Sequence, residues 1–585
     1  MIEAPRTGAS TITVSDYLSL WLREREIAQV FTLPGGMIAP LLDAIYRHGD
    51  VELVTMHHEQ GVAFAVDGYG RYHGTPGVAL VTAGPGATNM LTAIASSYLD
   101  SVPGIYIAGQ VQAYLQKGDR AVRQYGFQEC ETVAMAAPVT KAAWRARSAE
   151  EVPELLDAAW ALAVSGRPGP VFVELPSDVQ TMPVAEGAAP DVRPYEPQPF
   201  EDAAAVDELL DALAGAERPL LLVGGGVHAA RAAERFRVFA RCLNMPVAAS
   251  VVALDVMPAG DPLRLGMIGM YGNRWVNHAA CEADVVAVFG SRLDFGTVGA
   301  DVVAWGRGRT VFQVDCDPGE MQRVRRAHRI EADLGAFLDL ALPRAQARSF
   351  VERPAWVARL EDLRHASPDT EELAGCEGIN PNVFVRQLSA ASSDAAAFVS
   401  DAGQHLWWAC QSIQPADEQR FVVALGMGSC GFGLPAGVGI CVGSGRPVVV
   451  IAGDGAFQFN IQELQTVVRN RLPLKIVILD NRSHGSVRQL QEQVFDGRYP
   501  STVDGYDAPD FARVAEVYGI ESTTVSEPDE VERALRWLWR DPTRPSLLHV
   551  LIPMELNVYP NVPFGASIST MESFHSQPVA GGLFG

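Results

Sequence analysis

The chain has 585 residues, of which 48% are hydrophobic and 20% charged, and its formal net charge is -23. A single hydrophobic core does not extend over such a length, so several domains are expected. The negative charge argues against nucleic acid and anionic membrane surfaces as partners. The eight cysteines include no CxxC pair, and neither a signal-peptide pattern nor a run of about 18 apolar residues occurs, so we expect a soluble cytoplasmic protein.

Short apolar strand patterns alternate with helical patterns in three blocks, at residues 11–180, 201–342 and 382–560. The clearest strand patterns of the first block lie at residues 30–32, 77–82 and 105–107. This alternation predicts an α/β protein with three domains, each a doubly wound parallel sheet that binds ligands at the carboxyl ends of its strands. The connecting segments are expected to be linkers, and the tail at residues 565–585 is predicted to be loosely ordered.

In the first block, Glu59 follows a strand pattern and opens a helix pattern with an apolar side. Burial disfavours a charged carboxylate, so we expect a raised pKa for Glu59 and a role in proton exchange. The alternative is a glutamate that stabilises the start of its helix. The segment TAGPGATN, from Thr82 to Asn89, is a strand-to-helix turn whose glycines let the backbone approach a ligand.

In the third block, the sequence Gly453-Asp454-Gly455 follows a buried strand pattern, and Asn481 comes directly after the next one. Parallel strands bring both residues to one sheet edge. Carboxylate and amide oxygens suit Mg²⁺, and the helix that starts near Ala456 favours an anion at its N-terminus. A Gly-Asp-Gly sequence alone is more often a simple turn, but with the spaced asparagine it predicts a cradle for a Mg²⁺-bound diphosphate.

These motifs resemble those of the thiamine diphosphate (ThDP) enzymes, and more closely their acetolactate synthase-like branch. The resemblance extends from about residue 15 to residue 564 and is carried by GDGAFQFNIQEL, HHEQ…DGYGR…GPGATN and DAGQH. It implies that Asp454, Asn481 and the backbone carbonyl of Ser483 hold Mg²⁺, and that Glu59 protonates the pyrimidine ring of ThDP. Because the two halves of such sites come from different subunits, it also implies a homodimer or homotetramer.

The resemblance implies further contacts with ThDP or substrate. Gly35, Phe127 and Gln128 are expected on the substrate side, although Phe127 taken alone is more typical of a core residue. Gln404 and His405 are expected to donate hydrogen bonds to the diphosphate, although a lone histidine is more often structural. Cys430 stands where relatives commonly have Met, which predicts looser support of the bent cofactor. The other residues expected at ThDP are Pro34, Gly36, Thr82, Gly84, Pro85, Asn89, Gly426, Gly428, Gly453, Gly455, Ala456, Phe457, Ser483 and Gly485.

The second block contains VGGG after a strand pattern, which alone is a weak dinucleotide signal. In acetolactate synthase relatives this place holds FAD, together with GxRxD and DxDPxE elements that this chain also has. We therefore predict FAD in a structural, non-redox role, the alternative being a vestigial domain. The residues expected at FAD are Arg167, Gly224, Gly225, Gly226, Gly290, Arg292, Asp294, Asp315, Glu320 and Asp333.

The chain departs from acetolactate synthases where the second substrate binds. The Arg that holds a second ketoacid's carboxylate is replaced by Gly296, a pocket-forming Trp by Leu490, and a Lys by Ser177. Loss of a charge-assisted contact with a carboxylate costs about 1.5–3 kcal/mol. The half of the site that binds the two-carbon donor is thus predicted to be intact, whereas the half that binds the acceptor differs.

The segments KGDRAVRQYGFQE and QVDCDPGE resemble a subgroup that is found with sugar-modifying pathways. The main hypothesis is therefore a ThDP-dependent carboligase that decarboxylates pyruvate and transfers the two-carbon hydroxyethyl unit to a carbonyl acceptor, such as a keto sugar. One alternative is acetolactate (acetohydroxyacid) synthase proper. Another is a non-catalytic scaffold with the ThDP fold, which the motifs at Glu59 and Asp454 disfavour.

Overall fold

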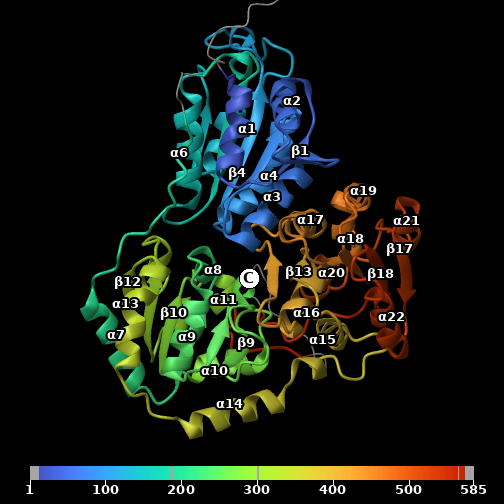
Figure 1. The fold of residues 1–585 in the computed structure, drawn as a ribbon. Coiled ribbons are helices and arrows are strands. Elements are labelled where there is room, and N and C mark those ends of the chain that lie inside the picture. Colours follow the sequence, from blue (N-terminus) through green and yellow to red (C-terminus); the bar gives the residue numbers. More distant parts are fainter. Residues whose placement is uncertain (1–11, 185–188, 300–301, 564, 574–585) are drawn as a thin grey trace, which may run out of the picture. The chain divides into compact units, whose positions relative to one another are not determined.

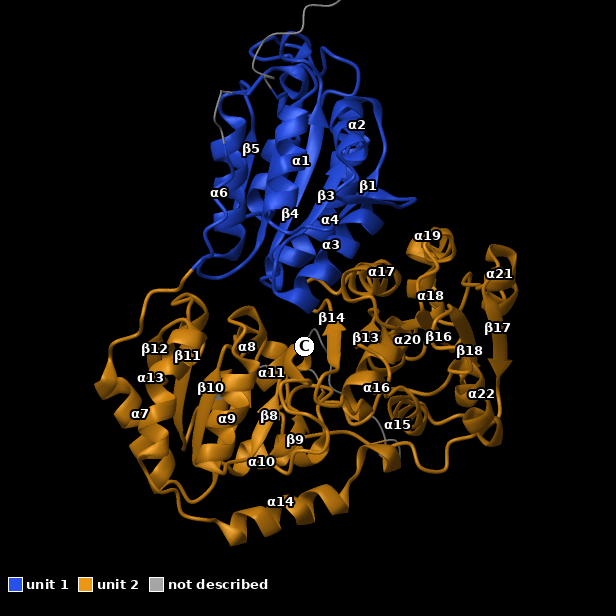
Figure 2. Ribbon diagram, viewed as in Figure 1, with its two compact units in different colours: residues 1–195 blue, residues 196–585 orange. Residues whose placement is uncertain are grey.

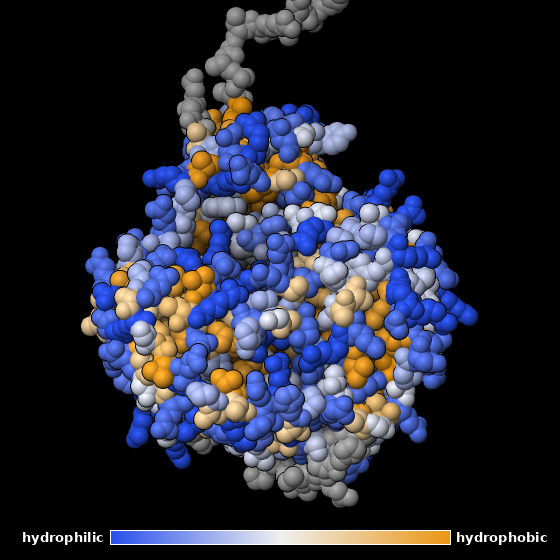
Figure 3. Space-filling view, turned by 60° about the horizontal axis from the view of Figure 1, so that its bottom comes forward, coloured by the Kyte–Doolittle hydropathy of each residue, from blue (hydrophilic) through white to orange (hydrophobic). Residues whose placement is uncertain are grey.

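The computed structural model describes residues 12–184, 189–299, 302–563 and 565–573. These residues form two compact units, residues 1–195 and 196–585 (Figure 2). Hydrophilic residues predominate on the face shown in Figure 3, as expected for a net charge of -23, and hydrophobic residues form small groups between them. Among the described residues, no helix has the length and apolar character needed to cross a membrane.

The first unit is a parallel sheet flanked by helices (Figure 1). The sheet has six strands in the order β2-β1-β3-β4-β6-β5. Its strands are β1 Gln29–Leu33, β2 Glu52–Thr55, β3 Gly77–Val81, β4 Gly104–Gln110, β5 Ala142–Arg145 and β6 Pro170–Pro176. Its helices are α1 Val14–Glu24, α2 Ala39–His48, α3 Glu59–His73, α4 Pro85–Leu99, α5 Thr132–Ala136 and α6 Val152–Val164. Strands β3, β4 and β6 are buried along their whole length, which explains their continuous apolar sequences.

The second unit contains two more parallel sheets. The first of them has the order β12-β11-β10-β7-β8-β9 and the bounds β7 Pro219–Val223, β8 Val247–Ala249, β9 Arg264–Met267, β10 Val285–Phe289, β11 Thr310–Asp315 and β12 His328–Glu331. Its helices are α7 Ala203–Gly215, α8 Gly226–Ala229, α9 Ala233–Leu243, α10 Arg274–Glu282, α11 Phe295–Val298, α12 Val302–Trp305, α13 Leu334–Gln346 and α14 Pro354–Ala366.

The other sheet of this unit has the order β14-β13-β15-β16-β18-β17. Its strands are β13 Ala397–Ser400, β14 Arg420–Val423, β15 Val448–Gly453, β16 Leu474–Asp480, β17 Glu521–Val525 and β18 Ser546–Leu551. Its helices are α15 Pro381–Ala391, α16 Gln404–Ser412, α17 Gly433–Ser444, α18 Asp454–Phe457, α19 Leu464–Arg469, α20 Gly485–Val494, α21 Phe511–Tyr518 and α22 Val531–Leu538. Three α/β domains with six parallel strands each, as found in the described residues, confirm the predicted fold class.

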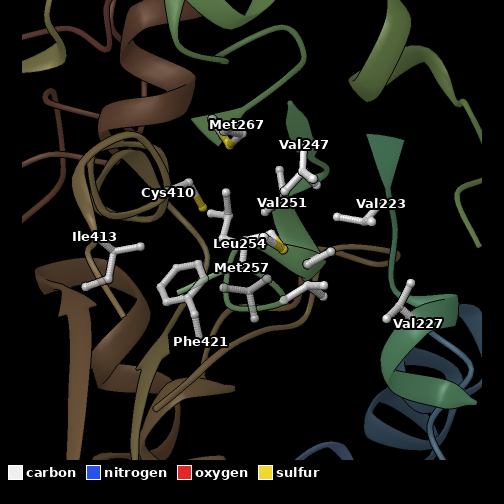
Figure 4. Packing of buried hydrophobic residues seen from close by; sticks show 14 of the residues in the cluster. Val223, Val227, Val247, Val251, Leu254, Met257, Met267, Cys410, Ile413 and Phe421 are labelled. Carbon is white, nitrogen blue, oxygen red and sulfur yellow. The ribbon is translucent and has the colours of Figure 1, made fainter. Parts of the chain in front are cut away.

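The two sheets of the second unit share one hydrophobic core. Buried residues from both belong to the same cluster, so that Val251 and Leu254 lie near Cys410 and Phe421 (Figure 4). A buried polar group joins the sheets as well: Asp255 accepts hydrogen bonds from His228 Nε2 at 2.7 Å and from Arg420 Nε at 2.6 Å. Packing and charge pairing therefore fix these two sheets to each other.

The C-terminal segment differs from the sequence prediction. Ile568 is buried against the second unit's core, Ser567 forms a β-bridge with Gly299, and Arg274 donates hydrogen bonds to the carbonyls of Met571 and Glu572. The expectation of a loosely ordered tail is therefore wrong for residues 565–573, since apolar burial and backbone pairing hold them in place. Residues 574–585 lie outside the described part of the chain.

Candidate active site

In the first unit, the predicted residues gather at the carboxyl ends of three adjacent strands, β2, β1 and β3. Leu33 of β1 pairs with Val81 of β3, so the turn that contains Pro34, Gly35 and Gly36 lies beside Thr82. A Cβ atom on Gly35 would lie 2.4 Å from the Thr82 Cβ, so this approach requires glycine. The Thr82 hydroxyl is buried and has no hydrogen-bond partner among the described residues, which leaves a polar group for a ligand.

Glu59 is the first residue of α3 and lies across from the start of α4, the helix that begins at Pro85. The Asn89 side chain donates a hydrogen bond to Glu59 Oε2 at 2.9 Å. A Cβ atom on Gly86 would lie 3.7 Å from Oε1. Asn89, expected at the cofactor, thus contacts the proposed catalytic carboxylate.

Phe127 and Gln128 lie on a loop that is held at its base by Glu129. The Glu129 carboxylate accepts hydrogen bonds from the backbone N–H groups of Lys117, Tyr125 and Gly126. Partial burial alone would raise the pKa of Glu129, but these N–H groups lower it below its ordinary value. Phe127 is 80% exposed and therefore not a core residue.

Gln128 reaches the turn after β3. Its backbone has a φ of 69°, and its carbonyl oxygen would lie 2.8 Å from a Cβ atom on Gly84. Gly84 itself has a φ of 61°, so both its conformation and its contact favour glycine. The loop and the turn are therefore in direct contact, as the proposed substrate side of the site requires.

The metal-ligand candidates lie at the ends of neighbouring strands in the third sheet. Gly453 of β15 pairs with Leu479 of β16, which brings Asp454 and Asn481 to one edge. Asn481 Nδ2 donates to Gln404 Oε1 at 2.8 Å, and its Oδ1 accepts from the Ser483 hydroxyl at 3.2 Å. The Ser483 carbonyl accepts from the Gly485 N–H at 2.8 Å and keeps a second lone pair.

The Asp454 carboxyl lies where a negative charge is costly. Burial, and then the nearby Asp480, raise its pKa to about 7. The Tyr506 hydroxyl donates to Asp454 Oδ2 at 2.7 Å, and no ion pair to Asp454 is found among the described residues. A bound cation would supply the missing positive charge, so the donor set fits Mg²⁺.

The candidate Mg²⁺ ligands are one carboxylate (Asp454), one side-chain amide (Asn481) and one backbone carbonyl (Ser483). Across the described ranges, no group of three or more His, Cys, Asp and Glu side chains is arranged to hold a metal.

His405 provides the second indication of a ligand at this edge. It is buried, and burial lowers its pKa to about 3, so the imidazole is neutral. Its Nε2 atom has no hydrogen-bond partner in the described part of the chain. Cβ atoms on Gly403 and Gly453 would lie 2.6 and 2.7 Å from its ring. A neutral ring with an unused nitrogen between two glycines fits the predicted diphosphate contact.

The other expected ThDP residues of this domain lie in turns at the same edge. Asp401 joins two of them by accepting hydrogen bonds from the Gly431 and Gly433 N–H groups at 3.0 and 2.8 Å. Burial raises the pKa of Asp401 to about 6 and that of the Cys430 thiol to about 11. Further members of the set are Gly426 after β14, Gly428 with a φ of 64°, Gly455, Ala456 and Phe457 in α18, and Gly485 at the start of α20.

Except for Arg167 of the first unit, the residues expected at FAD follow four neighbouring strands, β7, β10, β11 and β12. Gly224 and Gly226 pack on Gly290: Cβ atoms on them would lie 2.3 Å from its carbonyl oxygen and 2.6 Å from its Cα. The same strand ends suit a dinucleotide. The glycines and carboxylates also have structural contacts, so the geometry is compatible with FAD without requiring it.

Each remaining FAD candidate has its own contact or place within the protein. Asp294 and Asp333 accept hydrogen bonds at helix starts, Asp315 accepts from the Asp317 N–H, Glu320 pairs with Arg323, Arg292 pairs with Asp294, Gly225 lies in the turn, and Arg167 of the first unit donates to Ser101.

The positions that are predicted to depart from acetolactate synthases lie on separate elements. Gly296 is in the short helix α11, where a Cβ atom would meet only Asp294 Oδ1, at 3.5 Å. Leu490 is on α20 and 42% exposed. Ser177 follows β6, and its N–H donates to the Gln110 carbonyl at 2.9 Å. Gly296 thus has room for a Cβ atom.

Sequence reasoning missed two residues that contact the candidate metal ligands and their neighbours. Tyr506 comes from a segment without helical or strand periodicity, and no signal in the sequence indicates its contact with Asp454. Gln489 accepts a hydrogen bond from Gln404 Nε2 at 3.0 Å. It lies four residues after Gly485 on α20, and this spacing, which places both on one helix face, could have indicated it.

Comparison with known proteins gives consistent results along the chain. Three family models match: thiamine pyrophosphate enzyme, N-terminal TPP binding domain, at residues 12–135; central domain, at residues 206–340; and C-terminal TPP binding domain, at residues 401–550.

Among curated proteins, the acetolactate synthase isozyme 2 large subunit of Escherichia coli K12 is 38% identical over 558 residues, covering 94% of this chain and 97% of its own. The acetolactate synthase large subunit of Lactococcus lactis is 32% identical over 580 residues, covering 98% and 97%. The isozyme 1 large subunit of Escherichia coli K12 is 33% identical over 574 residues, covering 96% and 97%.

Proposed function

Because this chain belongs to the thiamine diphosphate enzymes, we propose that it is an acetolactate synthase. In this reaction pyruvate loses its carboxylate as CO₂, and its remaining two-carbon unit forms a C–C bond with the carbonyl carbon of a second 2-ketoacid. The observation that carries the proposal is the buried Asp454 beside Asn481, in a chain similar to acetolactate synthases over almost its whole length.

In this proposal Asp454, Asn481 and the Ser483 carbonyl bind Mg²⁺, and Gln404 and His405 hold the diphosphate. Bound ThDP would supply the carbon nucleophile that attacks pyruvate. Neutral His405 offers its unpartnered nitrogen to a phosphate oxygen at no cost in buried charge.

In the first unit, Asn89 holds the carboxylate of Glu59 by a hydrogen bond, and Glu59 would exchange a proton with the pyrimidine ring of bound ThDP. Gly35, Phe127 and Gln128 contact the substrate side. The close approach of Gly35 to Thr82 supports this assignment, since backbone rather than a side chain then faces the ligand.

A non-2-ketoacid acceptor is the second candidate, and one observation favours it: Gly296 stands where the resemblance to acetolactate synthases implies a carboxylate-binding Arg. The more specific hypothesis of a keto sugar, and of the sugar-pathway subgroup, gains no support from the comparisons. The three relatives described above are acetolactate synthases, which agrees better with the alternative of acetolactate synthase proper. The hypothesis of a non-catalytic scaffold is disfavoured because these relatives are named as enzymes.

The test is a product assay with ThDP, Mg²⁺ and pyruvate as sole substrate. Acetolactate synthase activity predicts acetolactate as the main product, detected directly and after acid decarboxylation to acetoin. Pyruvate consumption that occurs only when a keto sugar or aldehyde is added would support the second candidate. If ThDP binds and pyruvate is not consumed under either condition, both assignments are wrong.

We also propose that residues 11–180 contain the pyrimidine-binding domain, residues 201–342 the FAD-binding domain and residues 382–560 the diphosphate-binding domain, followed by a tail at 565–585. The FAD proposal rests on the four strand ends described above. Purified protein should show oxidised-flavin absorption, or gain it on incubation with FAD. Lack of absorption after reconstitution would indicate a vestigial domain.

That the protein forms a homodimer or homotetramer is still a prediction, and so is its cytoplasmic location. Analytical ultracentrifugation with and without ThDP would test the first.

A further inference from the structure

Tyr506 lies outside every motif of the sequence, yet its side chain contacts the centre of the candidate metal site. It comes from the connection between α20 and α21, and its hydroxyl donates to Asp454 Oδ2 at 2.7 Å. Its ring packs on His484 with a centroid distance of 4.4 Å. A Cβ atom on Gly455 would lie 2.7 Å from the His484 ring and 3.4 Å from the Tyr506 hydroxyl, so Gly455 makes room for both.

The segment that carries Tyr506 is tied to the first turns of α20. The His484 N–H donates to the Thr502 carbonyl at 3.1 Å, and Gln491 Nε2 donates to the Pro500 carbonyl at 3.1 Å. The Tyr506 N–H in turn donates to the Val503 carbonyl at 3.2 Å. The hydroxyl is therefore positioned by the same helix that follows Asn481 and Ser483.

We propose that Tyr506 is a positioning residue for the metal, which holds one oxygen of the Asp454 carboxylate so that the other faces Mg²⁺. A carboxylate fixed at one oxygen keeps a single orientation, and such outer contacts strengthen metal binding. The inference rests on the proposed function, because it takes Asp454 as a ligand of ThDP-bound Mg²⁺. It adds a residue that couples the connection between α20 and α21 to metal affinity.

The experiment compares Tyr506→Phe with the unmodified protein. ThDP binding is measured by isothermal titration calorimetry at a series of Mg²⁺ concentrations, and Mn²⁺ paramagnetic resonance reports the metal independently of turnover. We expect about a tenfold higher Mg²⁺ requirement in Tyr506→Phe. Because positioning acts only through the metal, kcat and the KM for pyruvate at saturating Mg²⁺ should change little, and so should the melting temperature of the metal-free protein.

Tyr499→Phe is the matched control, since Tyr499 lies in the same connection and its hydroxyl has no hydrogen bond among the described residues. It should leave the Mg²⁺ requirement unchanged. An unchanged or lower Mg²⁺ requirement in Tyr506→Phe would overturn the inference while the proposed function stands. The inference would also be overturned if the metal-free melting temperature of Tyr506→Phe fell far enough for this loss of stability alone to explain its weaker Mg²⁺ binding. If the unmodified protein shows no Mg²⁺-dependent ThDP binding, the inference and the proposed function both fail.

Discussion

Asp454 is almost fully buried, and burial together with Asp480 raises its pKa to about 7. Asparagine at this position would remove the charge and keep an oxygen in nearly the same place. We therefore expect Asp454→Asn to preserve the melting temperature of the metal-free protein. Its Mg²⁺-dependent ThDP affinity should fall by about tenfold to hundredfold, the cost of one charge-assisted contact. Scanning calorimetry without metal and titration calorimetry with ThDP and Mg²⁺ measure the two effects.

The matched control is Asp507→Asn, an exposed aspartate near Tyr506 whose carboxylate caps the Ala508 N–H. It should alter neither quantity. Unchanged Mg²⁺-dependent ThDP binding in Asp454→Asn would mean that the carboxylate does not hold the metal.

For Glu59 the expected loss is in turnover rather than in binding. In Glu59→Gln the amide oxygen can still accept the hydrogen bond from Asn89, so the local structure should persist. An amide cannot exchange a proton with the pyrimidine ring, so pyruvate consumption should fall by about 10²–10⁴-fold with ThDP binding retained. Steady-state assays and ThDP titration test this, with Glu52→Gln on β2 as an exposed control. Near-normal turnover would exclude Glu59 from the proton transfer.

At the scale of elements, buried apolar strands and the glycine turns that follow them were readable from the sequence. For this reason the sequence alone predicts Asp454 and Asn481 at one sheet edge, where the strand pairing places them. Contacts from irregular segments were not readable, because no periodicity indicates where such a segment packs. Tyr506 is one example, and the packing of Ile568 against the second unit's core is another.

Asp255 is a buried polar contact between the two sheets of the second unit. Its carboxylate accepts hydrogen bonds from His228, Arg420 and the Phe421 N–H. Asp255→Asn would leave the half-buried Arg420 without its charge partner. Because breaking a fully buried pair costs about 3–5 kcal/mol, the cost here should lie below that range. We expect a lower denaturant midpoint by chemical unfolding, with Asp261→Asn, which pairs with the more exposed Arg241, as the milder control. Equal effects of the two substitutions would contradict a special role for Asp255.

The same group predicts loss of stability in acid. Burial alone would raise the pKa of Asp255, but His228 and Arg420 hold it well below its usual range. Burial, and then Arg420, lower the pKa of His228. Both pKa values are depressed by folding, so their contributions are complete above the unfolded pKa values, about 3.9 and 6.5, and fall as the pH drops below each. Asp255 itself raises the pKa of His228, so Asp255→Asn lowers that pKa further. Melting temperatures taken at about half-unit steps between pH 7.5 and 4 should therefore decline at least as steeply in Asp255→Asn as in the unmodified protein, and less steeply only below about pH 4, where Asp255 titrates.

At the scale of the whole molecule, the three positions that are predicted to alter the acceptor half lie far apart in the chain. Gly296 belongs to the first sheet of the second unit and Leu490 to the other, whereas Ser177 follows β6 of the first unit. The similarity to acetolactate synthases along the chain does not determine which acceptor these positions favour.

Restoring the two side chains in the second unit tests which acceptor the protein uses. Without an Arg at Gly296, the carboxylate of a second ketoacid lacks this anchor, so its KM should be high, by about tenfold to hundredfold. The Gly296 backbone is outside the left-handed region, and among the described residues a Cβ atom there meets Asp294 Oδ1 at 3.5 Å, an ordinary contact, so the backbone accepts a residue with a side chain. We expect Gly296→Arg with Leu490→Trp to lower the KM for the second ketoacid and raise acetolactate output. Gly296→Ala, which adds a methyl group without charge, should not change either quantity.

Products are measured by chromatography after incubating pyruvate with 2-ketobutyrate, an aldehyde and a neutral ketone together. Fast, saturable acetohydroxyacid formation by the unmodified protein would show that the missing Arg does not limit the acceptor, and acetolactate synthase proper would then stand without the second candidate.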